Sequence, residues 1–178
     1  CGKAAPNLDI RIDSSDPANV PGEILVRGAN VFLGYFKNDD ATDSVFTDDG
    51  WFKTGDMGVI DEDGCLFIKG RTKCMILGPS GQNIYPEEVE TVINSQPYVV
   101  DSLVVEDNGG LTALIYPDFA QGAKDGMNQD VFIKFMEDTL PELNKELPNY
   151  AKLKKIEIMS EDFERTPKKS IKRYLYQR

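Results

Sequence analysis

The sequence predicts an α+β fold in two parts, a β-rich first part and a small α+β second part. Apolar and polar residues alternate between residues 8 and 36, as they do in half-buried strands. After Gly70 the chain becomes glycine-rich and then helix-forming. From there the pattern reads helix, two strands, helix and strand, which predicts a compact unit with a three-stranded sheet and flanking helices.

Short strands separated by turn residues are expected throughout the first part. "LDIRI" and "GEILVRG" alternate, and "VFLGYF" is a further candidate, so two or three short antiparallel strands are expected here. "WFKTGD" is expected to be a short strand that runs into a tight turn. Two more strands, Val59–Ile60 and Cys65–Ile68, flank "EDG", a sequence that favours a hairpin turn.

The second part is expected to begin with a glycine loop followed by a helix. Pro86 suits the first helical turn, and the two glutamates after it favour the positive end of the helix. Val89, Val92 and Ile93 have the spacing of one apolar face. We therefore expect this helix to pack on the core.

The rest of the second part supplies the sheet and another helix. "VVDSLVVED" and "LTALIYP" flank "NGG" and predict a strand pair, and "KLKKIEIMS" predicts the last strand. Asn128 is expected to cap a helix that Pro141 breaks or restarts. The apolar residues expected on one side of this helix are Val131, Phe132, Phe135 and Met136. The domain boundary is expected between Arg71 and Cys74.

Composition excludes several classes of function. The formal charge of −10 argues against a nucleic-acid-binding surface. The chain has no apolar run of about 18 residues and no leader in the order of a signal peptide, so the cytoplasm is expected. The three cysteines are irregularly spaced and form no metal-ligand set. Because the chain contains no histidine, a Ser-His-Asp or Cys-His nucleophile within it is excluded. Nothing in the sequence indicates an oligomeric state.

Three segments combine charged residues with glycine or proline in a way that suits a ligand. In "KTGD", residues 53–56, a carboxylate after a glycine can accept hydrogen bonds from the vicinal hydroxyls of a ribose. In residues 70–83, an arginine precedes a glycine loop and could reach a phosphate or a ribose oxygen. In "RTPKKSIKR", residues 165–173, five cations lie within nine positions without an acid, which suits a polyphosphate. An Asx-type turn, a solvated interdomain loop and a solvated terminus are the respective alternatives.

In chain order, "GEILVRGANVFLGYFKN", "GWFKTGD", "GRTKCMILGPSGQNIYPEEVE" and "TPKKSIKRYLY" resemble the carboxy-terminal part of the adenylate-forming superfamily. This superfamily comprises acyl-CoA synthetases, luciferases and peptide-synthetase adenylation domains. The resemblance covers essentially the whole chain and is greatest to long-chain fatty acyl-CoA ligases. It implies that residues 1–72 are the last β-rich, barrel-like subdomain of a large N-terminal domain. Residues 73–178 would then be the small mobile C-terminal α+β domain.

The resemblance assigns roles to individual residues. Asp56, in the Thr-Gly-Asp motif that Thr54 begins, would hold the ribose hydroxyls of the nucleotide, and Arg71 would contact the same ribose. Lys73 falls on the hinge about which the small domain swings between the two half-reactions. The glycine loop that contains Gly78 and Gly81 would line the pantetheine tunnel during thioester formation.

The basic tail departs from the family pattern. The family's catalytic lysine, which bridges the carboxylate and the α-phosphate, falls on Ser170. Lys169 lies one residue earlier and would point to the opposite face of a strand, although it could reach the site from a loop. Lys172 lies two residues later, on the same face as Ser170 in an extended segment. Lys169, Ser170 and Lys172 are therefore the candidate catalytic positions.

The resemblance implies a C-terminal piece of an ATP-dependent fatty acyl-CoA ligase that is inactive by itself. Its expected substrates are a fatty acid, ATP and CoA, with AMP as a product and Mg²⁺ held mainly by an upstream part of the protein. The "CGKAAPNLDIRI" opening, which lacks Met and reads as the middle of a domain, supports a piece of a longer chain. Three alternatives stay open. They are an adenylation domain that loads a carrier-protein thiol, a non-catalytic relative that binds nucleotide or acyl-CoA, and a self-sufficient α+β protein.

Overall fold

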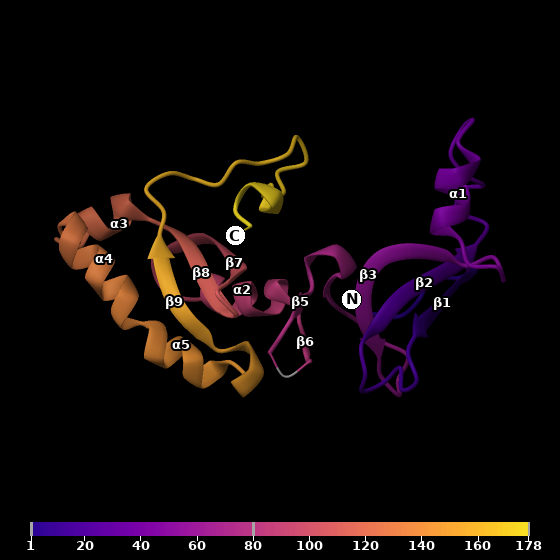
Figure 1. The fold of residues 1–178 in the computed structure, drawn as a ribbon, viewed down its shortest axis with the longest axis horizontal. Coiled ribbons are helices and arrows are strands. Elements are labelled where there is room, and N and C mark those ends of the chain that lie inside the picture. The colour runs from indigo at the N-terminus through magenta and orange to yellow at the C-terminus, as the bar shows by residue number, and fades with distance from the viewer. Residues whose placement is uncertain (1, 80, 178) are drawn as a thin grey trace. The chain divides into compact units, whose positions relative to one another are not determined.

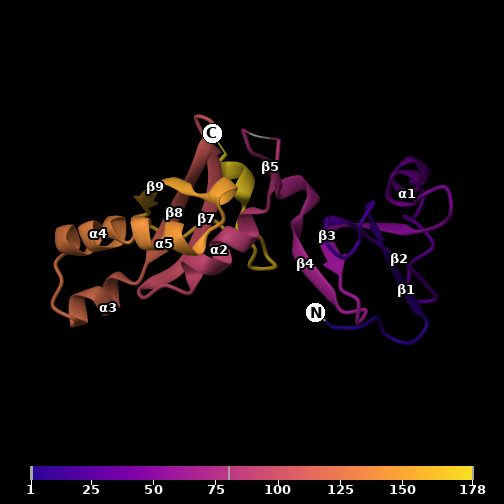
Figure 2. The ribbon, with the colours of Figure 1, turned by 90° about the horizontal axis from the view of Figure 1, so that it is seen from below.

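The structure is a computed structural model that describes residues 2–79 and 81–177. The chain forms two compact units, Cys1–Met75 and Ile76–Arg178, and each unit has its own main sheet. Figure 1 labels most elements of both units, and Figure 2 shows the same ribbon turned by 90° and also labels β4. The predicted α+β class is confirmed, with a β-rich first unit and a second unit in which helices flank a three-stranded sheet.

Four antiparallel strands form the sheet of the first unit (Figure 1). They neighbour one another in chain order, as β1 (Leu8–Asp13), β2 (Gly22–Gly28), β3 (Phe52–Ile60) and β4 (Leu66–Arg71). Helix α1 (Asp39–Val45) lies between β2 and β3 in the sequence, and a 3₁₀ turn, Thr72–Cys74, follows β4. Within the described residues the sheet is open, with β1 and β4 as its edges, so it does not close into a barrel.

A small core stabilises the sheet of the first unit. Trp51 is buried, and the guanidinium groups of Arg11 and Arg27 lie over its rings, 4.6 and 4.4 Å from the ring centroid. Each contact is a cation–π interaction that also shields the indole from water. The other buried apolar side chains of this unit are Ile12, Ile24, Leu25 and Met57.

Some local predictions for the first unit need correction. Residues 31–36, all of which the structure describes, form no strand. Residues 8–36 therefore contain two of the two or three expected strands, β1 and β2. "WFKTGD" and Val59–Ile60 do not form separate strands, because β3 continues through a bulge at Gly55 instead of ending at a turn. Helix α1 was not predicted, since it contains no buried residue and so has no apolar stripe. Its start is defined by Asn38, whose side chain accepts a hydrogen bond from an amide of the first turn.

The second unit opens with a small hairpin, β5 (Ile76–Leu77) and β6 (Asn83–Ile84), followed by helix α2 (Pro86–Asn94). Its main sheet has the order β7-β8-β9, in which β7 is antiparallel and β9 parallel to β8. These strands are β7 (Val99–Asp107), β8 (Gly110–Pro117) and β9 (Leu153–Ile158). The crossover from β8 to β9 contains α3 (Phe119–Lys124), α4 (Gln129–Asp138), α5 (Leu140–Glu146) and a 3₁₀ turn, Asn149–Ala151.

Different elements cover the two faces of this sheet. Residues of α2, α4 and α5 pack with the strands in the main core, on the face to which Val104 belongs. The C-terminal tail covers the opposite face, where Phe163 is buried against Leu103, Val105 and Leu114. Successive strand residues point to opposite faces, so the alternation along β7 gives each cover its own apolar surface. Figure 1 shows this tail in yellow, ending in the 3₁₀ turn Arg173–Leu175.

Most predictions for the second unit are confirmed. Helix α2 begins at Pro86, the two strands on either side of "NGG" pair, and the last strand is β9. Asn128 caps α4, and the helix restarts at Leu140, next to Pro141. The predicted face of α4 is half right, because Phe132 and Met136 are buried whereas the other two apolar residues are exposed. Helix α3 and the β5–β6 hairpin were not predicted.

Candidate functional site

The Thr54–Gly55–Asp56 segment bulges out of the ladder between β2 and β3. Leu25 pairs with Lys53 and Glu23 pairs with Met57, so three residues of β3 face a single residue of β2. Gly55 has a φ of +73°, a left-handed conformation that glycine adopts without a Cβ penalty. Such a bulge redirects the side chains beside it. Here it redirects the side chain of Asp56.

Hydrogen bonds to neighbouring groups fix this bulge. The Thr54 hydroxyl donates to the carbonyl of Ile24 (2.8 Å) and accepts from the amide of Asp56 (3.1 Å). The amide of Gly55 donates to Oε1 of Glu23 (3.0 Å). Two of the amides that the bulge removes from the ladder are therefore satisfied by side chains. Thr54 consequently acts on Asp56 by fixing its backbone.

Asp56 and Arg71 form an ion pair between β3 and β4. They are directly opposite each other in the ladder, and Nε of Arg71 lies 2.9 Å from Oδ1 of Asp56. The Asp56 side chain is 29% exposed and the Arg71 side chain 62%. A carboxylate offers about four lone-pair sites, so Asp56 retains the capacity to accept further hydrogen bonds from a ligand. The structure thus brings together the two residues to which the resemblance assigns contacts with one ribose.

Lys73 lies in the 3₁₀ turn that follows β4. The turn is closed by the amide of Met75, which donates to the carbonyl of Arg71 (3.1 Å). Lys73 is exposed, and its ammonium group forms no ion pair with any described residue. The predicted hinge residue therefore lies in a solvated turn at the end of the first unit.

The glycine loop of the second unit is a tight hairpin between β5 and β6. The amide of Gly78 donates to the carbonyl of Gln82 (2.8 Å), and the amide of Gly81 donates to the carbonyl of Gly78 (2.9 Å). Gly81 has a φ of +78°. A Cβ on Gly78 would lie 3.1 Å from Cδ1 of Ile84, so the absence of a side chain lets the two strands approach.

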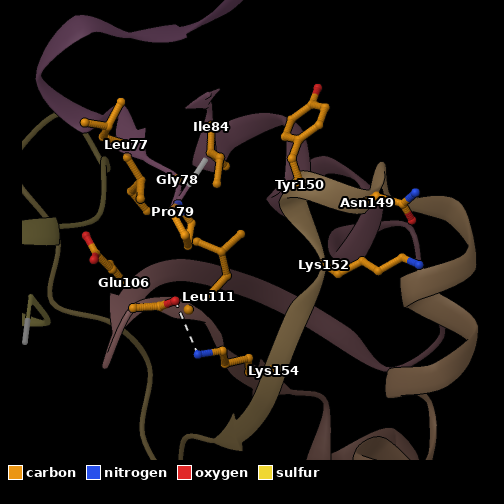
Figure 3. Close-up of a pocket in the computed structure, with 13 residues that line it drawn as sticks. Leu77, Gly78, Pro79, Ile84, Glu106, Leu111, Asn149, Tyr150, Lys152 and Lys154 are labelled. Atoms are coloured by element: carbon orange, nitrogen blue, oxygen red, sulfur yellow. Dashed lines mark hydrogen bonds between the residues drawn. The ribbon is translucent and has the colours of Figure 1, made fainter. Parts of the chain in front are cut away.

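A cavity of about 400 Å³ lies beside this hairpin (Figure 3). The hairpin lines it together with the turn between β7 and β8 and with residues 149–154. Its apolar lining includes Leu77, Ile84 and Leu111, and its polar lining includes Lys152. Lys154 also lines the cavity, and its ammonium group donates to the carbonyl of Gly109 (3.3 Å). Its lining therefore combines apolar walls with two lysines and one carboxylate, that of Glu106.

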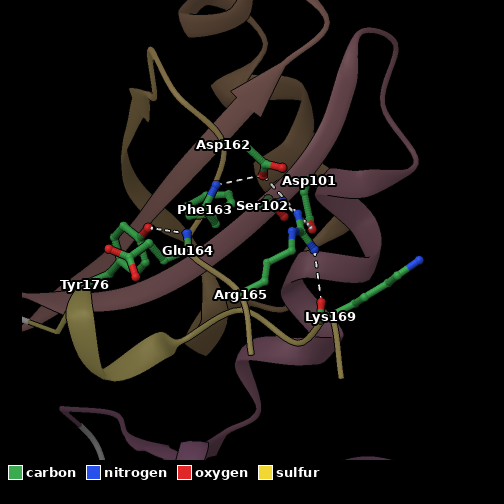
Figure 4. Close-up of polar contacts among 8 residues, drawn as sticks. All are labelled: Asp101, Ser102, Asp162, Phe163, Glu164, Arg165, Lys169 and Tyr176. Carbon is green, nitrogen blue, oxygen red and sulfur yellow. Dashed lines mark hydrogen bonds and ion pairs between the residues drawn. The ribbon is translucent and has the colours of Figure 1, made fainter. Parts of the chain in front are cut away.

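The basic tail forms a second hairpin, between Arg165 and Ile171 (Figure 4). The amide of Thr166 donates to the carbonyl of Ser170 (2.8 Å), and the amide of Lys169 donates to the carbonyl of Thr166 (2.8 Å). Lys169 has a φ of +64° at the tip of the hairpin. Lys169 and Ser170 are both exposed. The segment around Ser170 is a loop. Of the two candidate lysines, Lys169 is the one expected to reach the site from a loop, whereas Lys172 would be expected to do so from an extended strand.

Three of the five cations in the tail are paired with carboxylates of the chain. Arg165 pairs with Asp101 and Asp162. Lys172 pairs with Glu164, with 3.0 Å between Nζ and Oε2, and this hydrogen bond raises the pKa of Lys172. The remaining two cations, Lys168 and Lys169, are exposed and form no ion pair with any described residue.

Arg173, the last of the paired cations, connects the tail to helix α2. Its guanidinium group pairs with Glu90 and lies 3.7 Å from Oε1 of Glu87. Glu90 is buried, and its other carboxylate oxygen accepts from the amide of Val104 (2.7 Å). Burial raises the pKa of Glu90, and the charge of Arg173 opposes this shift. The pair therefore offsets the cost of a buried carboxylate.

The carboxylates that pair with the tail were missed in the sequence. Asp101 lies in β7 and Glu90 in α2, 64 and 83 residues away from their arginine partners. The local signals were Asp162 and Glu164, just before the basic run. A count of charges along the sequence therefore overstates the number of cations that can meet a ligand.

The described residues contain neither a membrane-spanning helix nor a metal-binding cluster. No helix in the described ranges has the length and apolar character of a membrane span. Within the same ranges, no group of three His, Cys, Asp or Glu side chains is arranged to bind a metal ion.

Comparisons with known proteins identify relatives. The chain is 44% identical over 106 residues to the long-chain-fatty-acid–CoA ligase FadD15 of Mycobacterium tuberculosis, an alignment that covers 60% of the chain and 16% of that protein. It is 43% identical over 107 residues to the 2-succinylbenzoate–CoA ligase of Bacillus cytotoxicus, covering 58% of the chain and 22% of that protein. The chain thus spans about a fifth of the length of such relatives, or less.

Solved structures resemble nearly the whole chain. ATP-bound MatB from Rhodopseudomonas palustris is 32% identical with a TM-score of 0.74, covering 98% of this chain and 34% of that one. O-succinylbenzoate coenzyme A synthetase (MenE) from Bacillus subtilis, in complex with ATP and magnesium, is 29% identical with a TM-score of 0.79, covering 97% and 34%. Residues 75–178 match the family model described as AMP-binding enzyme C-terminal domain. The chain therefore belongs to the adenylate-forming AMP-binding enzymes, in the family of their C-terminal domain.

Proposed function

We propose that this chain is part of an ATP-dependent acid–thiol ligase whose preferred acid is a long-chain fatty acid. In the first half-reaction a carboxylate oxygen attacks the α-phosphorus of ATP, giving an acyl-adenylate and pyrophosphate. In the second the thiol of CoA attacks the acyl carbon, giving acyl-CoA and AMP. The observation that carries the proposal is the Asp56–Arg71 pair beside the bulge, a built polar site of the kind that a ribose requires.

Asp56 would accept hydrogen bonds from the two ribose hydroxyls. Its Oδ1 is already paired with Nε of Arg71, which orients the carboxylate. Arg71 is more exposed than Asp56, so its remaining N–H groups can reach a ribose or phosphate oxygen without breaking the pair. Thr54 would keep Asp56 in place through the bulge.

The two parts of the chain would play different roles. Residues 1–72 would complete the large domain and contribute the ribose contacts. Residues 73–178 would be a mobile small domain, with Lys73 at the hinge. The 3₁₀ turn that contains Lys73 suits such a joint, because it contains no buried residue.

The hairpin that contains Gly78 and Gly81 would bind the pantetheine arm of CoA. The cavity beside it has apolar walls for the arm and cations, among them Lys152, for a phosphate. Bare glycines at the hairpin allow close approach of a thin chain. Mg²⁺ would be bound mainly by an upstream part of the enzyme.

Lys169 would provide the positive charge for adenylation in place of Ser170. Its ammonium group is exposed at the hairpin tip, whereas Lys172 is paired with Glu164. A cation stabilises the negative charge that develops on phosphate oxygens in the transition state. Ser170 cannot supply this charge.

The choice of acid rests on the similarity to FadD15 and on the "TPKKSIKRYLY" tail. Related proteins act on other acids by name, among them 2-succinylbenzoate and indoleacetate. The test is pyrophosphate release by the full-length protein with palmitate, 2-succinylbenzoate and indoleacetate, followed by acyl-CoA formation. We expect palmitate to give the highest kcat/KM, and the 178-residue chain alone to give no turnover. A higher kcat/KM for an aromatic acid would contradict the assignment of a fatty acid.

Two alternatives are tested in the same assay. Loading of a carrier-protein thiol in place of CoA would identify the adenylation-domain alternative. Binding of AMP without pyrophosphate release from any acid would identify a non-catalytic relative, and the replacement of the family's lysine by Ser170 is the feature that favours this alternative.

A further inference from the structure

Arg165 connects the basic hairpin of the tail to the sheet of the second unit. Its Nη2 lies 2.8 Å from Oδ2 of Asp101 in β7 and 3.0 Å from Oδ1 of Asp162 in the tail. Its Nη1 donates to the carbonyl of Lys169 (3.3 Å). Figure 4 shows the guanidinium group between the two carboxylates and the backbone of Lys169, whose ammonium group extends away from the cluster.

Both carboxylates are themselves held in place. Oδ1 of Asp101 accepts from the amide of Ser102 (2.9 Å), within a buried stretch of β7. Oδ1 of Asp162 accepts from the amide of Phe163 (2.7 Å), and the ring of Phe163 is buried against the sheet. The hydrogen bond from Arg165 lowers the pKa of Asp162, which keeps this partner ionised. Arg165 is thus bound to two carboxylates that backbone amides orient.

The hairpin tip needs such a support. Lys169 has a φ of +64°, a conformation that residues with a Cβ rarely adopt and that persists only where the surroundings enforce it. Within the hairpin, the backbone bonds of Thr166 to Ser170 and of Lys169 to Thr166 supply part of this enforcement. The bond from Arg165 to the carbonyl of Lys169 is the contact that ties the tip to the sheet.

We propose that Arg165 is a positioning residue that fixes the backbone of Lys169, and hence the location of its ammonium group, relative to β7. Arg165 already has two carboxylate partners, so it acts through Lys169 and not by contact with a substrate. A planar guanidinium group suits this task because its fork of donors can bind two carboxylates and a carbonyl at once. A lysine at this position could not span all three acceptors in a fixed geometry. The role of Lys169 in adenylation rests on the proposed function; the contact of Arg165 with the hairpin does not.

The first experiment measures amide hydrogen exchange in the 178-residue chain. In Arg165→Gln, the amides of Thr166 and Lys169 should exchange about tenfold faster than in wild type. In Arg165→Lys, the increase in the exchange rate should be smaller. Lys145→Gln is the matched control, because it also removes one cation from an ion pair of this unit, at 2.6 Å from Glu142. Unchanged exchange in Arg165→Gln would overturn the inference. The amides of β7 and β8 report whether each variant is folded. If Arg165→Gln does not fold, Asp101→Asn takes its place, with the same expectation of faster exchange and the same contradicting result.

The second experiment measures kcat and KM for ATP by pyrophosphate release in the full-length enzyme. Misplacement of a catalytic group by about 1 Å can cost up to about a hundredfold in rate. We expect Arg165→Gln to lower kcat at least about tenfold with little change in KM, Arg165→Lys to recover part of the rate, and Lys145→Gln to match wild type. If wild type is active and Arg165→Gln equals it, the positioning role is wrong. If wild type releases no pyrophosphate with any acid, the proposed function fails, and so does the catalytic role of Lys169. The exchange data would still decide whether Arg165 holds the hairpin.

Discussion

The Asp56 bulge of the first unit and the basic hairpin of the second unit both place charged groups beside a left-handed residue, but they are held differently. The bulge lies within a strand ladder, where Asp56 and Arg71 are direct neighbours in the register. The basic hairpin lies outside the sheet and depends on ion pairs to residues far away in the sequence. The difference teaches that backbone pairing positions the first site, whereas side-chain charge positions the second. Substitutions of charged side chains should therefore disturb the second region more.

The largest effect on stability is expected for Arg173→Met. This change leaves the buried carboxylate of Glu90 without its cation, and removing one partner of a buried pair costs about 3–5 kcal/mol. Because Arg173 is itself partly exposed, we expect the lower end, about 3 kcal/mol, in the unfolding free energy measured with urea. The matched control is Lys145→Met, which removes a cation from an exposed pair and should cost less than about 1 kcal/mol. Equal costs for the two variants would show that the Glu90 pair does not anchor the tail.

The pH dependence of the same variant sharpens this test. The folded pKa of Glu90 lies above its ordinary value of 4.5, and loss of Arg173 raises it further. The folded state then binds a proton more readily than the unfolded state, so the cost of an ionised Glu90 is present above the folded pKa and disappears as the pH falls towards 4.5. The stability difference between wild type and Arg173→Met should narrow from neutral pH towards 4.5. A difference that is constant or widens would contradict this explanation.

In the first unit, Asp56→Asn should have a small effect on stability and a large effect on nucleotide binding. The ion pair with Arg71 is largely exposed, so its loss should cost less than about 1 kcal/mol in stability. The same change would remove the proposed charge-assisted hydrogen bonds to a ribose, which are worth about 1.5–3 kcal/mol each, so AMP should bind at least about tenfold more weakly to the full-length enzyme. Calorimetric titration with AMP measures this. Unaltered affinity would exclude Asp56 from the nucleotide site.

The smallest effect is expected for Ser102→Ala. The Ser102 side chain is buried next to Asp101, the partner of Arg165 in β7. Its hydroxyl has no hydrogen-bond partner among the described residues. A buried hydroxyl without a partner costs about 1–3 kcal/mol, so its removal should leave stability unchanged or raise it by about 1 kcal/mol. Urea unfolding provides the measurement. A loss of more than about 1 kcal/mol would mean that the hydroxyl has a partner in solution.

The sequence predicted the parts of the fold that follow from short-range patterns. The strand pair around "NGG", the cap at Asn128, the first helical turn at Pro86 and the restart at Pro141 are all signals within a few residues. Helix α1 was missed because it buries no residue and so leaves no apolar period. The continuous strand β3 was missed because a glycine that ends a strand and one that forms a bulge look alike in sequence.

For the candidate site, the candidate residues could be named from the sequence, but their ion-pair partners are seen only in the structure. Asp56 and Arg71 were expected at one ribose, and their register across β3 and β4 places them in contact. The choice between Lys169 and Lys172 depends on Glu164 and on the left-handed tip at Lys169. Charge pairing of this kind is set by tertiary packing, and no spacing rule along the chain predicts it.

The most direct test of the central claim compares Lys169→Ala with Lys172→Ala in fatty-acid-dependent pyrophosphate release by the full-length enzyme. Removal of one group that stabilises transition-state charge costs about 10²–10³ in kcat. We predict such a loss for Lys169→Ala, a rate near that of wild type for Lys172→Ala, and recovery of activity when Ser170→Lys is added to Lys169→Ala. A large loss in Lys172→Ala with full activity in Lys169→Ala would contradict the claim that the hairpin tip carries the catalytic charge.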